Sequence, residues 1–117
     1  MPFIEQKPRT ADFLLPEANG SRSRETGEMA PTATAIYAGQ ILALNADGRY
    51  VPFAGKGDEP DSPVKAVGVL YANVPASDEP QAVVVIRRDA EVAGELLFGL
   101  DADATTDLQE VGVIVRI

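Results

Sequence analysis

Two apolar runs separated by Asp47-Gly48 constrain this chain more than any other feature of its sequence. In AGQILALNADGRYVPF (residues 38–53), the run Ile41–Leu44 precedes the Asp-Gly pair and the run Tyr50–Phe53 follows it. Aspartate and glycine both tolerate positive φ, so the pair predicts a tight turn between two antiparallel strands. This part of the chain is therefore expected to form a β-hairpin.

The rest of the patterned sequence also favours strands. KAVGVLYANV (residues 65–74) and QAVVVIRR (residues 81–88) are rich in β-branched residues and are joined by the turn-rich PASDEP. Their nearly continuous apolar character predicts central strands covered on both sides. GVIVRI (residues 112–117) predicts a last strand.

Helix signals are few. Thr106 is expected to cap a short helix that runs to Gly112, with acidic residues in its first turns where the helix dipole favours them. A further helical turn is expected near Glu91–Leu97. The predicted fold is therefore mainly β, an α+β arrangement with little helix, in one small β-barrel-like or β-tulip-type domain.

Length and charge restrict the class of protein. A chain of 117 residues is long enough for one domain with a hydrophobic core. It has no apolar stretch of membrane-spanning length, no signal peptide and no cysteine, which fits a protein made in the cytoplasm. The net charge of -8 argues against nucleic acid or an anionic membrane as a partner.

Composition narrows the chemistry that an enzyme could use, although it leaves a catalytic pair of Asp or Glu residues open, and no motif in the sequence argues for an enzyme. The chain has neither histidine nor cysteine, so the commonest general base and the strongest transition-metal ligands are missing. The stretch DADATTD (residues 101–107) has the oxygen-rich character of a calcium loop, but it lacks the glycine and glutamate of an EF-hand. It is interpreted as an acidic loop and helix start. We expect no catalytic residue, no metal and no cofactor. The carboxylates that cluster along the chain are Asp58, Glu59 and Asp61, then Asp78 and Glu79, then Asp101, Asp103 and Asp107.

The segment FLLPEANGSRSRE (residues 13–25) has two interpretations. In the first it is an N-terminal edge strand and turn, with Phe13, Leu14 and Leu15 on the core. In the second it is an arm that orders on a partner by adding a strand to the partner's sheet. Alternating small and charged residues after Gly20 suit both, because successive strand residues point to opposite faces.

The chain resembles the bacteriophage lambda-type head decoration protein D family. DFLLPEANGSRSRE (residues 12–25) is the specific match. It is followed in the family's order by AGQILA, YVPF, GVLYANVPA, AVVVIRRDAEV and GVIVRI. The resemblance covers roughly residues 12–117. The loop Gly55–Pro63 is peculiar to this sequence, and Leu97–Glu110 is shorter and more acidic than the helical piece of the family.

The resemblance implies a non-enzymatic virion protein, made in the host cytoplasm and bound to the outer surface of the capsid. Homotrimers would sit at threefold and quasi-threefold positions of the expanded head and clamp neighbouring major capsid proteins. Residues 1–30 would be a flexible capsid-binding arm and residues 31–117 the decoration domain, so that deleting Met1 to Thr26 should leave a folded domain. The residues that the resemblance makes candidate capsid contacts are Phe13, Leu14, Leu15, Asn19, Arg22, Ser23, Arg24 and Glu25.

Two other functions remain open at this point. A small β-barrel could bind a ligand or assist an enzyme, with AGQILAL and GVLYANV lining a cleft that carries convergent polar groups. A head–tail or tail adaptor would also be a structural virion protein, at a different position in the particle.

Overall fold

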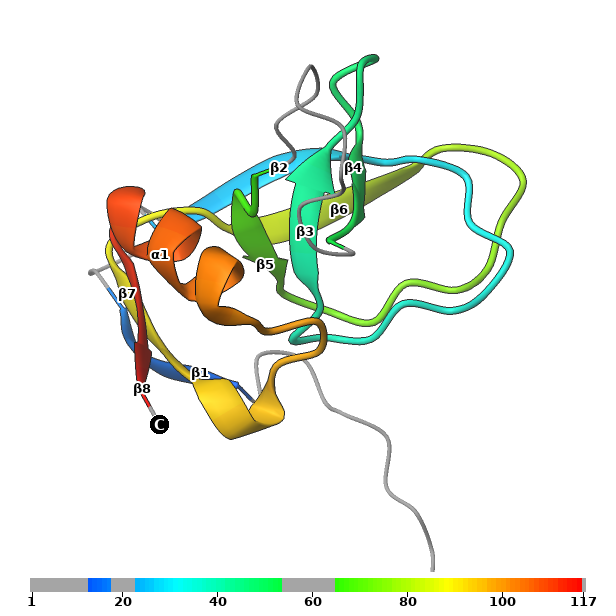
Figure 1. Ribbon diagram of the computed structural model, residues 1–117. Helices are drawn as coiled ribbons and strands as arrows, with labels where there is room; N and C mark the ends of the chain where they lie inside the picture. The colour runs from blue at the N-terminus through cyan, green and yellow to red at the C-terminus, as the bar shows by residue number, and fades with distance from the viewer. Residues whose placement is uncertain (1–12, 18–22, 54–64, 117) are drawn as a thin grey trace, which may run out of the picture.

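A computed structural model describes residues 13–17, 23–53 and 65–116 of the chain, with the backbone alone at 15–17 (Figure 1). Strands dominate these residues, which confirms the mainly β prediction. The elements are, in chain order, β1 (Leu14–Glu17), β2 (Arg24–Met29), β3 (Ile41–Leu44), β4 (Tyr50–Pro52), β5 (Gly68–Leu70), β6 (Gln81–Ile86), β7 (Ala90–Ala93), the 3-10 helix η1 (Gly94–Leu96), α1 (Ala102–Glu110) and β8 (Val113–Arg116).

Five strands close into a barrel in the order β2-β4-β3-β5-β6. The longest ladder joins β2 and β6 antiparallel, from Arg24 opposite Ile86 to Met29 opposite Gln81. Closure depends on one parallel pairing, Met29 with Tyr50, which brings β2 to β4. Because a closed barrel has no free sheet edge, every barrel strand is needed to satisfy the backbone of its neighbours.

The hairpin predicted at Asp47-Gly48 is confirmed, and its loop is longer than a two-residue turn. The Asn45 N–H donates to the Arg49 carbonyl (2.8 Å) and the Gly48 N–H to the Asn45 carbonyl (3.0 Å). Only Gly48 of the pair has a positive φ, 78°. The connection is therefore a three-residue loop with glycine in the left-handed position, a common alternative to the tighter turn.

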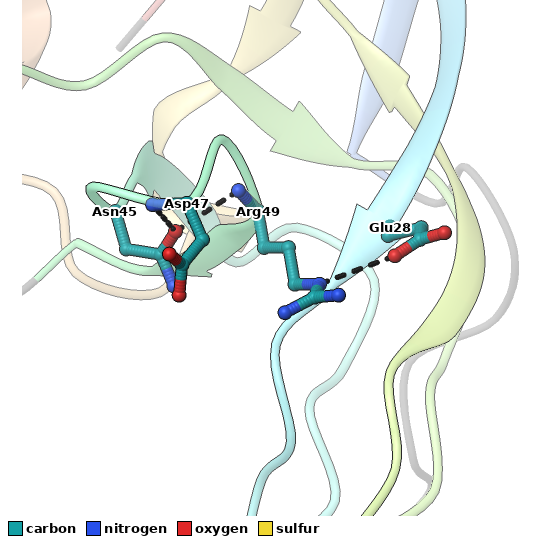
Figure 2. A network of polar contacts seen from close by, with 4 residues as sticks. All are labelled: Glu28, Asn45, Asp47 and Arg49. Carbon is teal, nitrogen blue, oxygen red and sulfur yellow. Dashed lines mark hydrogen bonds and ion pairs between the residues drawn. The ribbon is translucent and has the colours of Figure 1, made fainter.

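Side chains reinforce this loop, as Figure 2 shows. The Asn45 carboxamide oxygen accepts hydrogen bonds from the N–H groups of Asp47 (2.9 Å) and Arg49 (3.0 Å). The guanidinium of Arg49 donates to Glu28 on β2 (3.2 Å). Asparagine at the loop start thus supplies the turn-stabilising acceptor, and Arg49 ties the hairpin to the neighbouring strand.

A second layer covers one end of the barrel. Its sheet has the order β1-β7-β8, with β1 antiparallel and β8 parallel to β7. Helix α1 packs beside β8, and together they enclose a core shared with the barrel (Figure 1). This shared core includes Phe13, Ile41, Phe53, Val92 and Leu108, and a second cluster inside the barrel includes Met29, Leu42, Tyr50, Leu70 and Val85.

The helix starts five residues earlier than the sequence indicates. Asp101 is the N-cap: its backbone is extended and its carboxylate accepts from the Ala104 N–H at 2.7 Å. Thr106 lies inside α1, where its hydroxyl donates back to the Ala102 carbonyl (3.1 Å). Aspartate is at least as good a cap as threonine. The prediction of Thr106 as N-cap was therefore wrong, while the helical turn expected near Glu91–Leu97 is present as η1.

The sequence predicts an arm that ends at residue 30 and a domain that begins at residue 31. In the described fold, the barrel already includes residues before 30. Residues 24–29 form β2, a barrel strand paired along its whole length with β6, and Phe13 and Met29 are buried in the core. Deleting residues through Thr26 would remove half of β2 and open the barrel. The structure thus argues against a folded domain that begins after residue 30, because the apolar partners of the core extend back to Phe13.

Candidate functional site

The predicted contact residues fall in two parts of the described structure. Phe13 and Leu14 belong to the start of β1, and Ser23, Arg24 and Glu25 to the start of β2. The backbone of Leu15 lies in β1, and its side chain is outside the described part. Asn19 and Arg22 also lie outside the described residues.

Phe13 anchors the beginning of the described chain. Its side chain is 1 % exposed and its carbonyl accepts a hydrogen bond from the Ala93 N–H (2.8 Å). Leu14 pairs with Val92 of β7 and is half-buried against the same core. Among the described strands β1 is the end strand of its sheet, with β7 as its neighbour, and an end strand is the position at which another chain can add a strand.

Ser23, Arg24 and Glu25 are held at the end of the β2–β6 ladder. Ser23 is fully buried and its carbonyl accepts from the Arg87 N–H (2.9 Å). The Arg24 guanidinium lies 4.5 Å from the centre of the Tyr71 ring, a cation–π distance. Glu25 accepts a hydrogen bond from Arg88 at 2.5 Å. These side chains therefore have partners within their own chain.

A cluster of positive charge surrounds Glu25 in this acidic protein. Arg87 lies 3.7 Å from the Glu25 carboxylate and also donates to the Tyr50 hydroxyl (3.2 Å). Glu25 and Arg88 are each about two-fifths exposed, so solvent screens their pairing and its contribution to stability is small. The cluster holds the start of β2 against the residues that follow β6, and it adds little to the free energy of unfolding.

In the described residues, one hollow of about 250 Å³ touches the GVLYANV segment, and its lining is mostly apolar: Thr26, Ala72, Asn73, Val74, Ala82, Val83 and Val84. AGQILAL and GVLYANV contribute Ile41, Leu42, Val69 and Leu70 to the core, where they pack against one another. A hollow of about 460 Å³ lies at the tips of two loops, lined by Pro31, Thr32, Ala33, Ala76, Ser77 and Asp78. It is open and bordered mostly by small side chains, and the hydroxyls of Thr32 and Ser77 form hydrogen bonds within their own loops, to the Thr34 carbonyl (2.8 Å) and from the Glu79 N–H (3.1 Å).

The described residues contain neither a metal-binding cluster nor a membrane-spanning helix. Across 13–17, 23–53 and 65–116, no three side chains of the His, Cys, Asp and Glu types gather closely enough to hold a metal ion. Neither helix in that part of the chain has the length and apolar character needed to cross a bilayer.

One surface feature was missed at the sequence level. Leu96 and Phe98 are the most exposed large hydrophobic side chains of the described residues, at 47 % and 41 %. The run Leu96-Leu97-Phe98 indicates a helical turn or a buried plug, and η1 is present, yet only Leu97 turns towards the core. Two glycines, Gly94 and Gly99, flank this run in the sequence. Because glycine disfavours regular helix and strand, they indicate a short irregular segment that cannot bury three large side chains.

Comparison with known proteins bears on the whole fold. The family model described as Bacteriophage lambda head decoration protein D matches residues 3–113. No curated protein matches the chain. The match spans both layers of the structure, from the strand that opens the second sheet to the first residue of β8. The chain therefore belongs to the bacteriophage lambda head decoration protein D family, whose members are structural proteins of the phage head.

Proposed function

We propose that this protein decorates the outer surface of an expanded phage head as a homotrimer. It sits at threefold and quasi-threefold positions and clamps neighbouring copies of the major capsid protein. Its N-terminal arm adds a strand to a sheet of the capsid protein. The observation that carries the proposal is the family match across residues 3–113.

The described geometry supports a role for β1 in strand addition. It is the end strand of the described sheet, paired with β7 on one edge, and strand addition would take place at its other edge. Buried Phe13 fixes the root of the arm to the core, so it acts as an anchor rather than as a contact. In the described part of the chain, β1 is then the strand of the arm, and β2 belongs to the barrel.

Ser23, Arg24 and Glu25 then have a supporting role in this proposal. They position the chain where it enters the barrel, through the buried Ser23 and the Glu25–Arg88 pair. Of the eight residues predicted from the sequence, four remain proposed capsid contacts: Leu14, Leu15, Asn19 and Arg22.

Trimer formation explains how a short arm could hold a protein on the shell. A threefold ring of identical chains requires a heterologous interface that closes. Three weak arm contacts in one trimer act together, because binding of the first raises the effective concentration of the other two.

Imaging tests the proposal directly. Purified protein is mixed with expanded, undecorated heads and examined by cryo-microscopy, with unexpanded heads as the control. We expect threefold density at threefold and quasi-threefold positions of the expanded heads alone. Isolated monomers, or density at fivefold positions only, would contradict the proposal.

A further inference from the structure

The hairpin loop between β3 and β4 holds the only aspartate of the chain that is followed by glycine, Asp47. The backbone nitrogen that follows an aspartate can attack the carboxyl carbon of its side chain and close a five-membered imide ring. Glycine in the second position hinders this attack least, because it has no Cβ. Among the aspartates of this chain, Asp47 is therefore the one best suited to form such a ring.

The structure leaves this position open. Asp47 and Gly48 are both exposed, and a Cβ added to Gly48 would meet no atom within 4 Å. Within the described residues, no hydrogen bond or ion pair engages the Asp47 carboxylate, although its backbone N–H is bonded. Neither a packed neighbour nor a polar partner in that part of the chain keeps the carboxyl group away from the next amide.

The hydrogen bonds of Asn45 restrain the reaction. The Gly48 N–H donates to the Asn45 carbonyl (3.0 Å). The Asn45 carboxamide oxygen accepts from the N–H groups of Asp47 (2.9 Å) and Arg49 (3.0 Å), as Figure 2 shows. The Gly48 nitrogen must leave its hydrogen bond before it can attack, so the reaction requires the loop to open locally. Such openings of exposed loops cost far less free energy than global unfolding.

We infer that Asp47 is a modification site, where the folded protein converts aspartate into isoaspartate at a rate set by the hydrogen bonds of Asn45. In the first step the Gly48 nitrogen bonds to the Asp47 Cγ. The nitrogen loses its proton and the carboxyl group its hydroxyl, and the two leave as one water molecule. In the second step water adds to one carbonyl carbon of the ring. Addition at Cγ restores aspartate, whereas addition at the backbone carbonyl carbon leaves the chain running through Cβ and Cγ, which is isoaspartate.

Isoaspartate lengthens the backbone by one carbon inside a three-residue loop. The length of this loop is matched to the hydrogen bond from the Asn45 N–H to the Arg49 carbonyl (2.8 Å). Arg49 contacts Glu28 on β2, and Tyr50, the next residue, pairs with Met29 to close the barrel. A longer loop displaces both contacts, so the modification should weaken barrel closure. This inference is independent of how the protein binds heads.

The test ages the purified full chain near neutral pH, well below its melting temperature, in water enriched in the heavy isotope of oxygen. Trypsin then releases residues 25–49 as one peptide, whose only aspartate is Asp47. Each opening of the ring adds one heavy oxygen atom, and fragmentation of the peptide distinguishes isoaspartate from aspartate. Asp47→Glu is the matched control, because its longer side chain closes a ring much more slowly. Asp101 and Asp103, both exposed and followed by alanine, are internal references.

We expect isoaspartate and heavy oxygen to accumulate at Asp47, and not at Asp101 or Asp103. The aged protein should also gain a component of lower melting temperature that aged Asp47→Glu lacks. Accumulation at Asp47 no faster than at the two references would overturn the inference. A melting curve unchanged by the modification would overturn its effect on the barrel.

Asn45→Ala tests the restraint and should raise the rate of modification about tenfold, because it removes two hydrogen bonds of the loop. The unaltered chain in urea gives the rate without any loop structure, and circular dichroism shows whether Asn45→Ala is folded. Equal rates in the folded variant and the unaltered protein would overturn the role of Asn45. If the variant does not fold, a rate in urea no higher than that of the folded chain would overturn it instead.

Discussion

Asp107 is the charged side chain buried most deeply in the described core. It is 3 % exposed, and its carboxylate accepts a hydrogen bond from the Ala66 N–H at 3.1 Å. This contact joins the middle of α1 to the chain that leads into β5. A buried N–H that loses its acceptor costs about 1–3 kcal/mol, so the bond matters more than an exposed one.

Replacing Asp107 by alanine should therefore lower the free energy of unfolding by about 1–3 kcal/mol. Asp107→Asn keeps an acceptor oxygen and should lose less. Asp103→Ala, in the exposed first turn of the same helix, should lose no more than about 1 kcal/mol. Urea denaturation of the three variants measures these differences. Equal losses in all three would show that the Ala66 bond is unimportant.

Gly48 tests the hairpin loop. Its φ is 78° and an added Cβ would meet no atom within 4 Å, so only backbone strain opposes a side chain there. Gly48→Ala should cost about 1–2 kcal/mol, whereas Gly48→Asn should cost less because asparagine tolerates the left-handed region. Thermal unfolding of both variants gives the comparison. A larger loss for asparagine than for alanine would contradict the assigned loop conformation.

At the scale of the element, the first two strands have different functions. β1 lies at the edge of a three-stranded sheet, and β2 closes the barrel. Removing an edge strand leaves a smaller sheet, whereas removing a barrel strand leaves each of its two neighbours with one unpaired edge. The two strands should therefore respond differently to truncation.

Deleting residues 1–12 should leave a cooperatively folding protein that binds heads weakly, because Phe13 and every described strand remain. Deleting residues 1–29 removes β2 as well and should abolish cooperative unfolding, since β6 and β4 lose their shared partner. Circular dichroism and thermal melts measure the fold, and co-sedimentation with expanded heads measures binding. Full head binding by the shorter deletion would show that residues 1–12 do not contribute to docking and would leave β1 as the docking strand.

Among the predicted capsid contacts, leucines should matter more than arginines. Leu14→Ala and Leu15→Ala remove apolar contacts worth about 1.5–3 kcal/mol when fully buried. Arg24→Ala removes the cation–π contact with Tyr71, worth about 0.5–2 kcal/mol, which its guanidinium makes within its own chain. Co-sedimentation compares the three, with melting curves to correct for stability. The idea fails if Arg24→Ala weakens head binding most.

Local signals made part of this fold predictable. The hairpin and the runs around Val69 and Val85 were recognised because turn residues and β-branched runs act over a few neighbours. The helix start was misplaced because Asp101 and Thr106 are both acceptable caps, and only packing of Ala104 and Leu108 selects the first. The place of β2 in the barrel was missed because it depends on β6, far away in sequence. Exposure of Leu96 and Phe98 likewise depends on contacts with Gly39 and Gln40.

At the scale of the whole molecule, charge should have little influence on decoration. The protein carries a net charge of -8. In the described residues, the ion pairs made by Arg49, Arg88 and Arg116 are partly exposed to solvent. Such pairs are screened by salt and contribute little. Raising NaCl from about 0.05 M to 0.5 M should therefore change the affinity for expanded heads by less than about tenfold. A decrease of several hundredfold, measured by co-sedimentation across the salt series, would instead indicate an electrostatic interface.

The closure of the barrel by distant strands has a consequence for how the protein is made. β2 can pair with β6 only after the ribosome has added roughly 60 more residues, and β1 waits still longer for β7. At about 5–20 residues per second, that delay is several seconds, during which early strands have no partner. Topologies of this kind fold slowly, because long loops must close before their contacts form. A chain interrupted before β6 is thus an aggregation hazard and not a weak decorator, so only completed chains can enter the assembly of the particle.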